Sequence, residues 1–291
     1  MLDISHIPSQ QQQTFTFYAT GNWQTWTKPR NAKFIEIFCL GGGGGGSHTI
    51  ATVASQGGGG GGASGGIVRG IIPAFLLPDT LYILVGKGGI GPSTTNTAGG
   101  SGGISYIGLQ PSTSEQTLIC KSSTTVAGGA SNAGAAGTAP TVSVVALSAF
   151  GNLGLFTAIA GVSGVAGGAN TGAAGNSQNA LGTSLVTGGA GGGGKTASVF
   201  GIGGRINPAT AVLTSTVLGG LSAGQDGDNG YGTLQPFCGT GGSGGAGITA
   251  GQGGRGGNGF YGCGGGGIGA GSVVSKAGDG GDGLVIITVI V

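Results

Sequence analysis

Charged side chains are scarce in this sequence, since Asp, Glu, Lys and Arg together make up only 6% of its 291 residues. The formal net charge is +2, and the basic residues stand singly along the chain. Proteins that bind nucleic acid or anionic membrane surfaces need a basic patch or stripe. The sequence therefore predicts no nucleic-acid partner and no polybasic membrane anchor.

Long uninterrupted apolar runs are also missing. The most apolar window, residues 67–85, contains Arg69, Pro73 and Asp79, and the apolar run that ends the chain has only eight residues. A membrane-spanning helix needs about 20 apolar residues. The first residues show neither the basic stretch nor the apolar stretch of a secretory signal. We expect no membrane insertion, and synthesis in the cytoplasm of the producing cell.

Residues that carry catalysis or hold metals are few and scattered. The two histidines, His6 and His48, lie far apart, and the eight acidic residues do not form pairs. Nothing in this pattern activates a nucleophile, so the sequence predicts no enzyme, no catalytic residue, no metal site and no cofactor. A lone histidine beside a turn, as at His48, is typical of a surface residue that donates or accepts a hydrogen bond.

The four cysteines, Cys39, Cys120, Cys238 and Cys263, follow no regular spacing and include no C-x-x-C pair. They match neither a zinc ribbon nor a dense disulfide framework. We interpret them as small buried thiols, because free cysteine is usually buried.

Residues 189–196, "GAGGGGKT", satisfy the phosphate-binding pattern G-x-x-x-x-G-K-[ST], with Lys195 and Thr196 in the functional positions. That loop requires a strand before it and a helix after it, and the glycine-rich flanks predict no helix. We interpret the match as a coincidence in a glycine-rich background.

Two segments resemble calcium-binding loops. Residues 277–285 come close to a calcium-binding nonapeptide, and residues 224–230 resemble the start of an EF-hand loop. Nonapeptide coils need tandem copies, and the EF-hand loop needs a Glu at its end; both are missing. Asp279 and Asp282 are expected to face solvent or to pair with a cation from a neighbouring segment.

Glycine is abundant, with 76 residues, yet 38% of the chain is apolar, which argues against disorder. Gly41–Gly46 form an unbroken run, and elsewhere glycine pairs separate single residues, as at Ala98, Ser101 and Ile104. This period of three matches the polyproline II conformation, which has about three residues per turn and no internal hydrogen bonds. Collagen has one glycine in three and abundant proline, so it is excluded.

Glycine helices of this kind can hydrogen-bond to one another backbone to backbone. Ordering a glycine residue costs at least about 1 kcal/mol in entropy, so a lone helix of this kind is unstable, whereas a packed array satisfies nearly every amide. We therefore expect a mostly β or irregular fold, in which a packed array of polyglycine II helices joins a small antiparallel β-region, with almost no α-helix. The alternative is a flexible glycine-rich linker.

Alternation of apolar and polar residues predicts short strands outside the glycine segments. Residues 14–29 are expected to form a hairpin around Gly21–Asn22, with Trp23 and Trp26 in the core. Further strands are expected at 32–40, 79–86, 103–109, 116–122, 141–147 and 283–291. We divide the chain into a leader, residues 1–13, and a single glycine-rich domain, residues 14–291.

The order of these features resembles the glycine-rich domain of bacteriophage tail-fibre and adhesin proteins. The matching pieces are residues 17–29, 34–46, 81–91, 99–108 and 278–289. The resemblance implies a polyglycine II sandwich in a virion structural protein, whose loops contact a bacterial surface receptor, either protein or glycan. Because only about a dozen residues precede the domain, a capsid or tail decoration or cement protein without receptor binding is the alternative.

Aromatic residues beside turns are our candidates for receptor contact, because a rigid ring can present a flat face to a sugar or a protein. They are Tyr231, Phe237, Phe260 and Tyr261; the other interpretation is that these rings cap the glycine array or seal it to the β-region. Within the polar leader, Leu2, Ile4 and Ile7 are candidates for attachment to other virion proteins. A homo-oligomer is compatible with the sequence.

Overall fold

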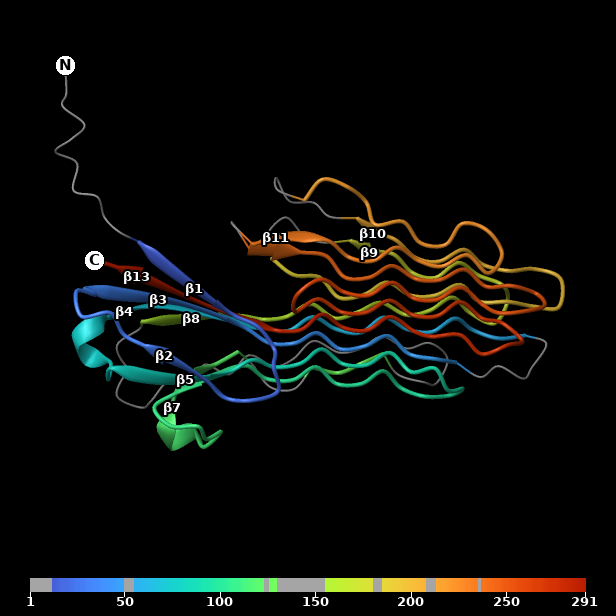
Figure 1. The fold of residues 1–291 in the computed structure, drawn as a ribbon. Coiled ribbons are helices and arrows are strands. Elements are labelled where there is room, and N and C mark those ends of the chain that lie inside the picture. Colours follow the sequence, from blue (N-terminus) through green and yellow to red (C-terminus); the bar gives the residue numbers. More distant parts are fainter. Residues whose placement is uncertain are drawn as a thin grey trace, which may run out of the picture.

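The computed structural model describes residues 12–49, 55–122, 126–129, 155–179, 185–207, 213–234 and 237–291. It is elongated: the main strands lie at one end, and wavy glycine-rich segments run side by side from them to the other end (Figure 1). The described helical structure consists of two 3-10 turns, η2 (Ala74–Leu76) and η3 (Glu115–Thr117). In the part of the chain that is described, no helix is long and apolar enough to cross a membrane.

The larger sheet has five antiparallel strands in the order β1-β13-β3-β4-β8. Their bounds are β1 (Gln13–Phe17), β13 (Leu284–Ile290), β3 (Phe34–Leu40), β4 (Ile67–Pro73) and β8 (Phe156–Ile159). The C-terminal strand β13 lies between β1 and β3, so the two ends of the domain are joined through this sheet.

The second sheet has four antiparallel strands in the order β2-β5-β6-β7. They are β2 (Gln24–Thr27), β5 (Thr80–Leu84), β6 (Tyr106–Gly108) and β7 (Leu118–Lys121). Two smaller ladders lie within the glycine-rich part: parallel β9 (Gln178–Asn179) with β10 (Ile206–Asn207), and antiparallel β11 (Gly232–Leu234) with β12 (Phe237–Gly239).

The two main sheets pack face to face over one apolar core. Alternate residues of β3, such as Ile35 and Ile37, point into it and are fully buried, and Leu81 and Ile83 of β5 meet them from the other sheet. This alternation follows from the period of two along a strand. Trp26 is buried in this core, which confirms its expected position.

Residues 14–29 do not form the expected hairpin, and that prediction is wrong. The turn is present, with Gly21 at φ 82°, but β1 pairs with β13 and β2 pairs with β5, so the two strands belong to different sheets. Phe15 and Trp26 contact each other edge to face at 6.0 Å between the sheets. A two-stranded hairpin buries little apolar surface, whereas crossing between sheets places both rings in the core.

The other predicted strands are largely confirmed: β3, β5, β6, β7 and β13 lie within the segments expected for them. The strand expected at 141–147 lies outside the described residues. β4 and β8 were not predicted. In β4, Gly70 interrupts the alternation of apolar and polar residues. A Cβ at Gly70 would lie 2.5 Å from the ring of Phe156 in β8, so the glycine makes room for an aromatic ring across the sheet.

The glycine-rich segments form the expected array. Consecutive amides of segment 41–47 donate to carbonyls of three different neighbouring segments: Gly43 to Gly281, Gly44 to Ala63 and Gly45 to Gly100, at 2.8–2.9 Å. Three residues later each neighbour is met again, since Gly46 donates to Gly278 at 2.9 Å. A period of three, with every bond made to another segment, is the pattern of polyglycine II.

The run Gly41–Gly46 is part of this array and is not a flexible linker. A Cβ at any of the six positions would lie 2.0–2.7 Å from a neighbouring atom, in most cases a backbone carbonyl. Real Cβ atoms do not approach that closely, so no larger residue fits. The segment is bare of side chains because it is surrounded by other segments on all sides.

The side chains of one outer layer replace the missing neighbours. On this face, Asp and Asn side chains accept hydrogen bonds from backbone N–H groups of the next segment: Asp226 from Arg255, Asn229 from Asn258, Asn258 from Asp279, Asp279 from Gly91 and Asp282 from Gly88, at 2.7–2.9 Å. We call this set the Asp/Asn ladder. Asp279 also pairs with Lys276 of its own segment at 2.6 Å. Asp279 and Asp282, for which the sequence allowed either solvent exposure or an ion pair, therefore cap amides that would otherwise bond only to water.

Candidate functional site

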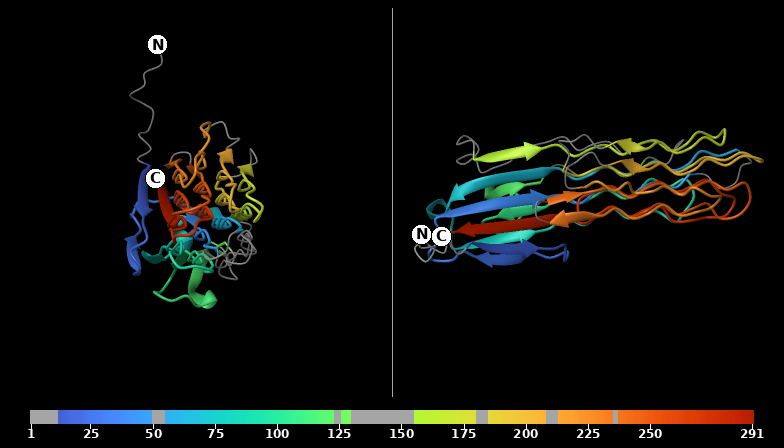
Figure 2. Two further views of the ribbon diagram at one scale, coloured as in Figure 1. Left: turned by 90° about the vertical axis from the view of Figure 1, so that its right-hand side faces the viewer. Right: turned by 90° about the horizontal axis from the view of Figure 1, so that it is seen from above.

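The molecule has two different ends, which we name proximal and distal. At the proximal end the chain enters β1 at Gln13, which pairs with Val289 near the end of β13. At the distal end, on the far side of the array, the glycine segments are joined by short loops (Figure 2). The described distal loops are residues 92–97, 170–172, 196–199, 222–224, 249–252 and 272–275.

The distal loops carry no charged residue within the described ranges and consist mainly of Ser, Thr, Asn, Ala, Val and Gly. Val273 and Val199 are exposed among them. Tight turns need a positive φ, which Asn96, Gly172 and Gly224 supply. The result is a neutral surface of hydroxyl, amide and small apolar groups.

Hydrogen bonds between neighbouring loops hold this surface in place. The amide of Gly251 donates to Ser272 Oγ at 2.8 Å, and Gln252 Nε2 donates to the carbonyl of Val274 at 3.0 Å. Loops with satisfied polar groups lose little conformational entropy on binding, so such a surface is suited to recognition.

The candidate aromatic residues lie at the opposite end of the array, at its junction with the sheets. Phe237 is buried, and its ring lies 5.0 Å from that of Phe38 in β3. Phe260 and Tyr261 are half-buried and contact each other at 5.0 Å, and Tyr261 also contacts Tyr18 at 5.9 Å. These rings seal the array to the larger sheet.

The environment of Tyr261 disfavours ionisation of its hydroxyl group. Burial, with smaller effects of Tyr18 and Asp282, raises the pKa of Tyr261 above its ordinary value of 10.0. Tyr231 lies apart from the other three rings: its hydroxyl donates to the carbonyl of Ser215 and accepts from the Ser215 amide at 2.9 Å. The structure thus brings Phe237, Phe260 and Tyr261 together and leaves Tyr231 separate, and receptor contact by any of them stays a prediction.

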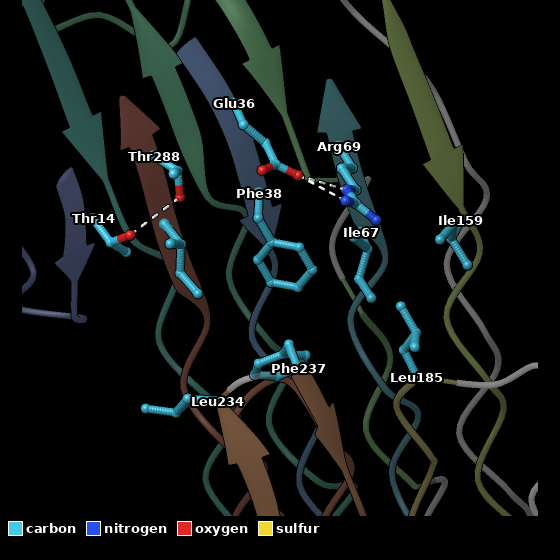
Figure 3. Close-up of a pocket in the computed structure, with 11 residues that line it drawn as sticks. Thr14, Glu36, Phe38, Ile67, Arg69, Ile159, Leu185, Leu234, Phe237 and Thr288 are labelled. Carbon is cyan, nitrogen blue, oxygen red and sulfur yellow. Dashed lines mark hydrogen bonds and ion pairs between the residues drawn. The ribbon is translucent and has the colours of Figure 1, made fainter. Parts of the chain in front are cut away.

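A groove of about 320 Å³ runs between the outer face of the larger sheet and the β11–β12 hairpin (Figure 3). It is lined by Thr14, Glu36, Phe38, Ile67, Arg69, Ile159, Leu185, Leu234, Phe237, Ile286 and Thr288. Sequence reasoning found only Phe237 here, because the groove is formed by segments that are far apart in the chain. Alternate residues of β3 and β4 that point away from the core supply its floor.

The two charged side chains that line this groove, Arg69 and Glu36, pair with each other. Arg69 donates from Nε and Nη2 to one carboxylate oxygen of Glu36, at 3.0 and 2.7 Å, and Thr14 contacts Thr288 at 3.5 Å. Because Glu36 already satisfies the guanidinium, the groove is suited to an apolar or aromatic group rather than to an anion.

Segment 189–196 lies within the array and lacks the helix that a phosphate-binding loop requires. Lys195 is buried, and its backbone exchanges two hydrogen bonds with that of Gln56, at 2.7 and 2.9 Å. The following turn is closed by Thr196 Oγ1, which accepts from the Val199 amide at 2.9 Å. The geometry offers no cradle for a phosphate.

His48 is buried rather than at the surface, which corrects the sequence interpretation. Its Nδ1 contacts the carbonyl of Thr49 at 2.6 Å. Burial lowers the pKa of His48 below its ordinary value of 6.5, against smaller opposing effects of backbone groups.

The four cysteines are free and buried, which confirms the prediction. Burial raises the pKa of Cys263 to about 12, and the neighbouring Cys120 thiol, followed by burial, raises that of Cys39. Within the described residues, no three His, Cys, Asp or Glu side chains gather closely enough to hold a metal ion. The attachment candidates Leu2, Ile4 and Ile7 lie outside the described residues.

Comparison with known proteins assigns this architecture to a family. Residues 18–289 match a family described as a glycine-rich domain. No curated protein matches the chain significantly. The matched range starts just after β1 and reaches into β13, so it includes the whole array and the strands of both main sheets apart from β1. The chain therefore belongs to the glycine-rich domain family.

Proposed function

We propose that the chain is a bacteriophage virion structural protein, a tail-fibre or receptor-binding adhesin that uses its glycine array as a rigid platform for host-recognition loops. The observation that carries this proposal is the opposition of the two ends. The chain enters the domain at the proximal end, and the neutral loops gather at the distal end of the array (Figures 1 and 2).

The array supports this role because it is rigid. Each interior segment is hydrogen-bonded to several others, so a glycine segment that carries a distal loop cannot shift without breaking amide hydrogen bonds. The neutral surface formed by hydroxyl and amide groups favours a receptor that is recognised by hydrogen bonds, either a glycan or an uncharged protein surface. On this proposal the protein is made in the host cytoplasm and works in the virion, with other virion proteins and the bacterial receptor as partners.

The test is binding of purified protein to cells of the bacterium that the virus infects. Val273→Asp places a charge on the exposed distal surface and is expected to lower binding at least tenfold. Leu218→Asp is the matched control, since Leu218 is similarly exposed (43% against 54%) on a lateral face of the array. Unchanged binding by Val273→Asp would remove the distal loops from the proposal.

The aromatic candidates are tested in the same assay. Tyr231→Phe removes only the hydroxyl, and Tyr261→Ala removes a ring at the junction; each variant is compared with wild type after its thermal stability has been checked. Loss of binding with an intact fold would locate receptor contact at the junction. If the wild-type protein binds no cell surface but occupies regular positions on particles, the decoration or cement role replaces the adhesin role.

A further inference from the structure

Large apolar side chains are exposed on the proximal end of the domain. Phe34 and Ile71 are 45% and 47% exposed, Leu76 is 38% exposed, and Phe75 at 82% is the most exposed large apolar side chain of the described residues. In the β3–β4 register Phe34 faces Pro73 and Ile71 lies diagonally next to Phe34 on the same face, with η2 following directly. We call these four residues the proximal patch.

The turn that presents Phe75 is held rigidly. Lys28 Nζ donates to the carbonyls of Ala74, at 3.0 Å, and Leu77, and also lies 3.5 Å from Asp79. Ala74 and Leu77 are buried on either side of the exposed pair Phe75 and Leu76. An inward-pointing ammonium therefore fixes η2 in place, so that Phe75 projects with little freedom to fold back.

A basic rim and a hollow flank the proximal patch. Arg30 and Lys33 are exposed in the turn before β3, and neither forms an ion pair within the described residues. The turn is tied to η2, because the Ala74 amide donates to the Lys33 carbonyl at 2.8 Å. Beside Phe75 lies a hollow of about 310 Å³, lined by Lys28, Pro29, Arg30, Ala32, Ala74, Phe75 and Asp79.

We propose that the proximal patch is a docking surface for another protein of the virion, one that offers an apolar socket for Phe75 with Asp or Glu side chains at its rim. Exposed apolar surface ringed by polar residues is characteristic of protein interfaces, and a rigid aromatic anchor is typical of their centres. Arg30 and Lys33, which form no ion pair within the described residues, outnumber the one exposed carboxylate of the hollow, Asp79, and so favour an acidic rim by charge complementarity. A second copy of this chain fits poorly, since two copies meeting here would bring these cations together.

The position of the patch agrees with this role. Ile290 pairs with Phe34 and Val289 pairs with Gln13, so the chain enters β1 at the same end as the patch. A docking surface at this end, opposite the distal loops, leaves those loops free. The inference rests on the proposed function in that it requires the chain to be part of a virion.

The experiment places the photo-crosslinking residue p-benzoylphenylalanine at position 75 in the full chain and isolates the particles that carry it. We expect a covalent adduct between position 75 and a different virion protein at an acidic-rimmed site, and no such adduct from position 273 at the distal end. In parallel, Phe75→Asp and the double variant Arg30→Glu, Lys33→Glu are expected to lower incorporation into particles at least tenfold. Ile90→Asp is the matched control, because Ile90 is 72% exposed and lies in a glycine segment that leads into the distal loop 92–97, away from the proximal patch.

The outcomes separate this inference from the proposed function. An adduct only to a second copy of this chain, or no adduct and normal incorporation of Phe75→Asp, would overturn the docking surface while the cell-binding result with Val273→Asp still decides the adhesin role. Absence of the wild-type chain from purified particles would overturn both. Because Phe75 is exposed, the thermal midpoint of purified Phe75→Asp should match that of the wild type. If the midpoint is lower, the crosslinking result alone decides whether the patch is a docking surface.

Discussion

Gly43 lies so close to Cys263 that a Cβ on Gly43 would be 2.0 Å from the Cys263 carbonyl oxygen. Gly43→Ala is therefore expected to destabilise the fold by about 3 kcal/mol, because a backbone carbonyl cannot move aside as a side chain can. Gly57→Ala is the control: its Cβ would meet its nearest atom at 3.1 Å, so we expect a change below about 1 kcal/mol. Urea unfolding followed by circular dichroism measures both, and equal stabilities would contradict the close-packed array.

The Asp/Asn ladder predicts a difference between two substitutions at one position. Asp282 Oδ1 accepts a hydrogen bond from the Gly88 amide at 2.7 Å. Asp282→Ala removes the acceptor and should lower stability by about 1 kcal/mol, whereas Asp282→Asn keeps a side-chain oxygen there and should lie close to wild type. Thermal unfolding distinguishes them; if both variants lose the same stability, the charge rather than the hydrogen bond matters.

Trp26 predicts a contrast between size and polarity in the sheet core. Its side chain is buried, and its Nε1 has no hydrogen-bond partner among the residues that the structure describes. Trp26→Ala should cost about 3–5 kcal/mol through the cavity it leaves. Trp26→Phe keeps most of the apolar volume and removes the unsatisfied N–H, so its loss should be clearly smaller. Similar losses in chemical denaturation would mean that Nε1 is satisfied in solution.

The buried thiols should be inert in the native protein. With a pKa of about 12, about one Cys263 thiol in 10⁴ is ionised at pH 8, and the thiolate is the reactive form. Native protein treated with a thiol-specific chromogenic reagent should therefore release almost no colour, while protein in denaturant should report all four cysteines. Rapid reaction of the native protein would show that the core opens frequently.

His48 predicts a loss of stability in mild acid. Its pKa is lowered in the folded state, so above about 6.5 both states hold a neutral imidazole and His48 adds no pH dependence. As the pH falls below the pKa of His48 in the unfolded chain, the unfolded chain binds the proton more readily than the folded protein. The free energy of unfolding therefore decreases until the pH has passed the folded-state pKa. Urea midpoints at pH 7.5 and 5.0 should differ less for His48→Asn than for wild type; an unchanged difference would assign the effect to other groups.

The neutral distal loops could not be identified from the sequence, because short segments rich in Ser, Thr and Asn look alike wherever they lie. The aromatic candidates were chosen for their rings and neighbouring turns, features that contact and core residues share. Only the packing of Phe237 against Phe38 and of Tyr261 against Tyr18 shows which surfaces those rings cover. Likewise, nothing local in residues 73–77 distinguishes the exposed Phe75 from the buried Ala74 and Leu77.

Local conformation follows from the amino-acid sequence: glycine pairs at a period of three produce the glycine helices, and alternation of apolar and polar residues produces strands such as β3 and β13. These follow from steric rules between near neighbours in the chain. The tertiary structure decided which segments meet, placing β1 against β13 instead of β2 and His48 in the interior. Partners are selected by the burial of apolar surface and the satisfaction of amides between segments distant in the chain, which no local pattern encodes.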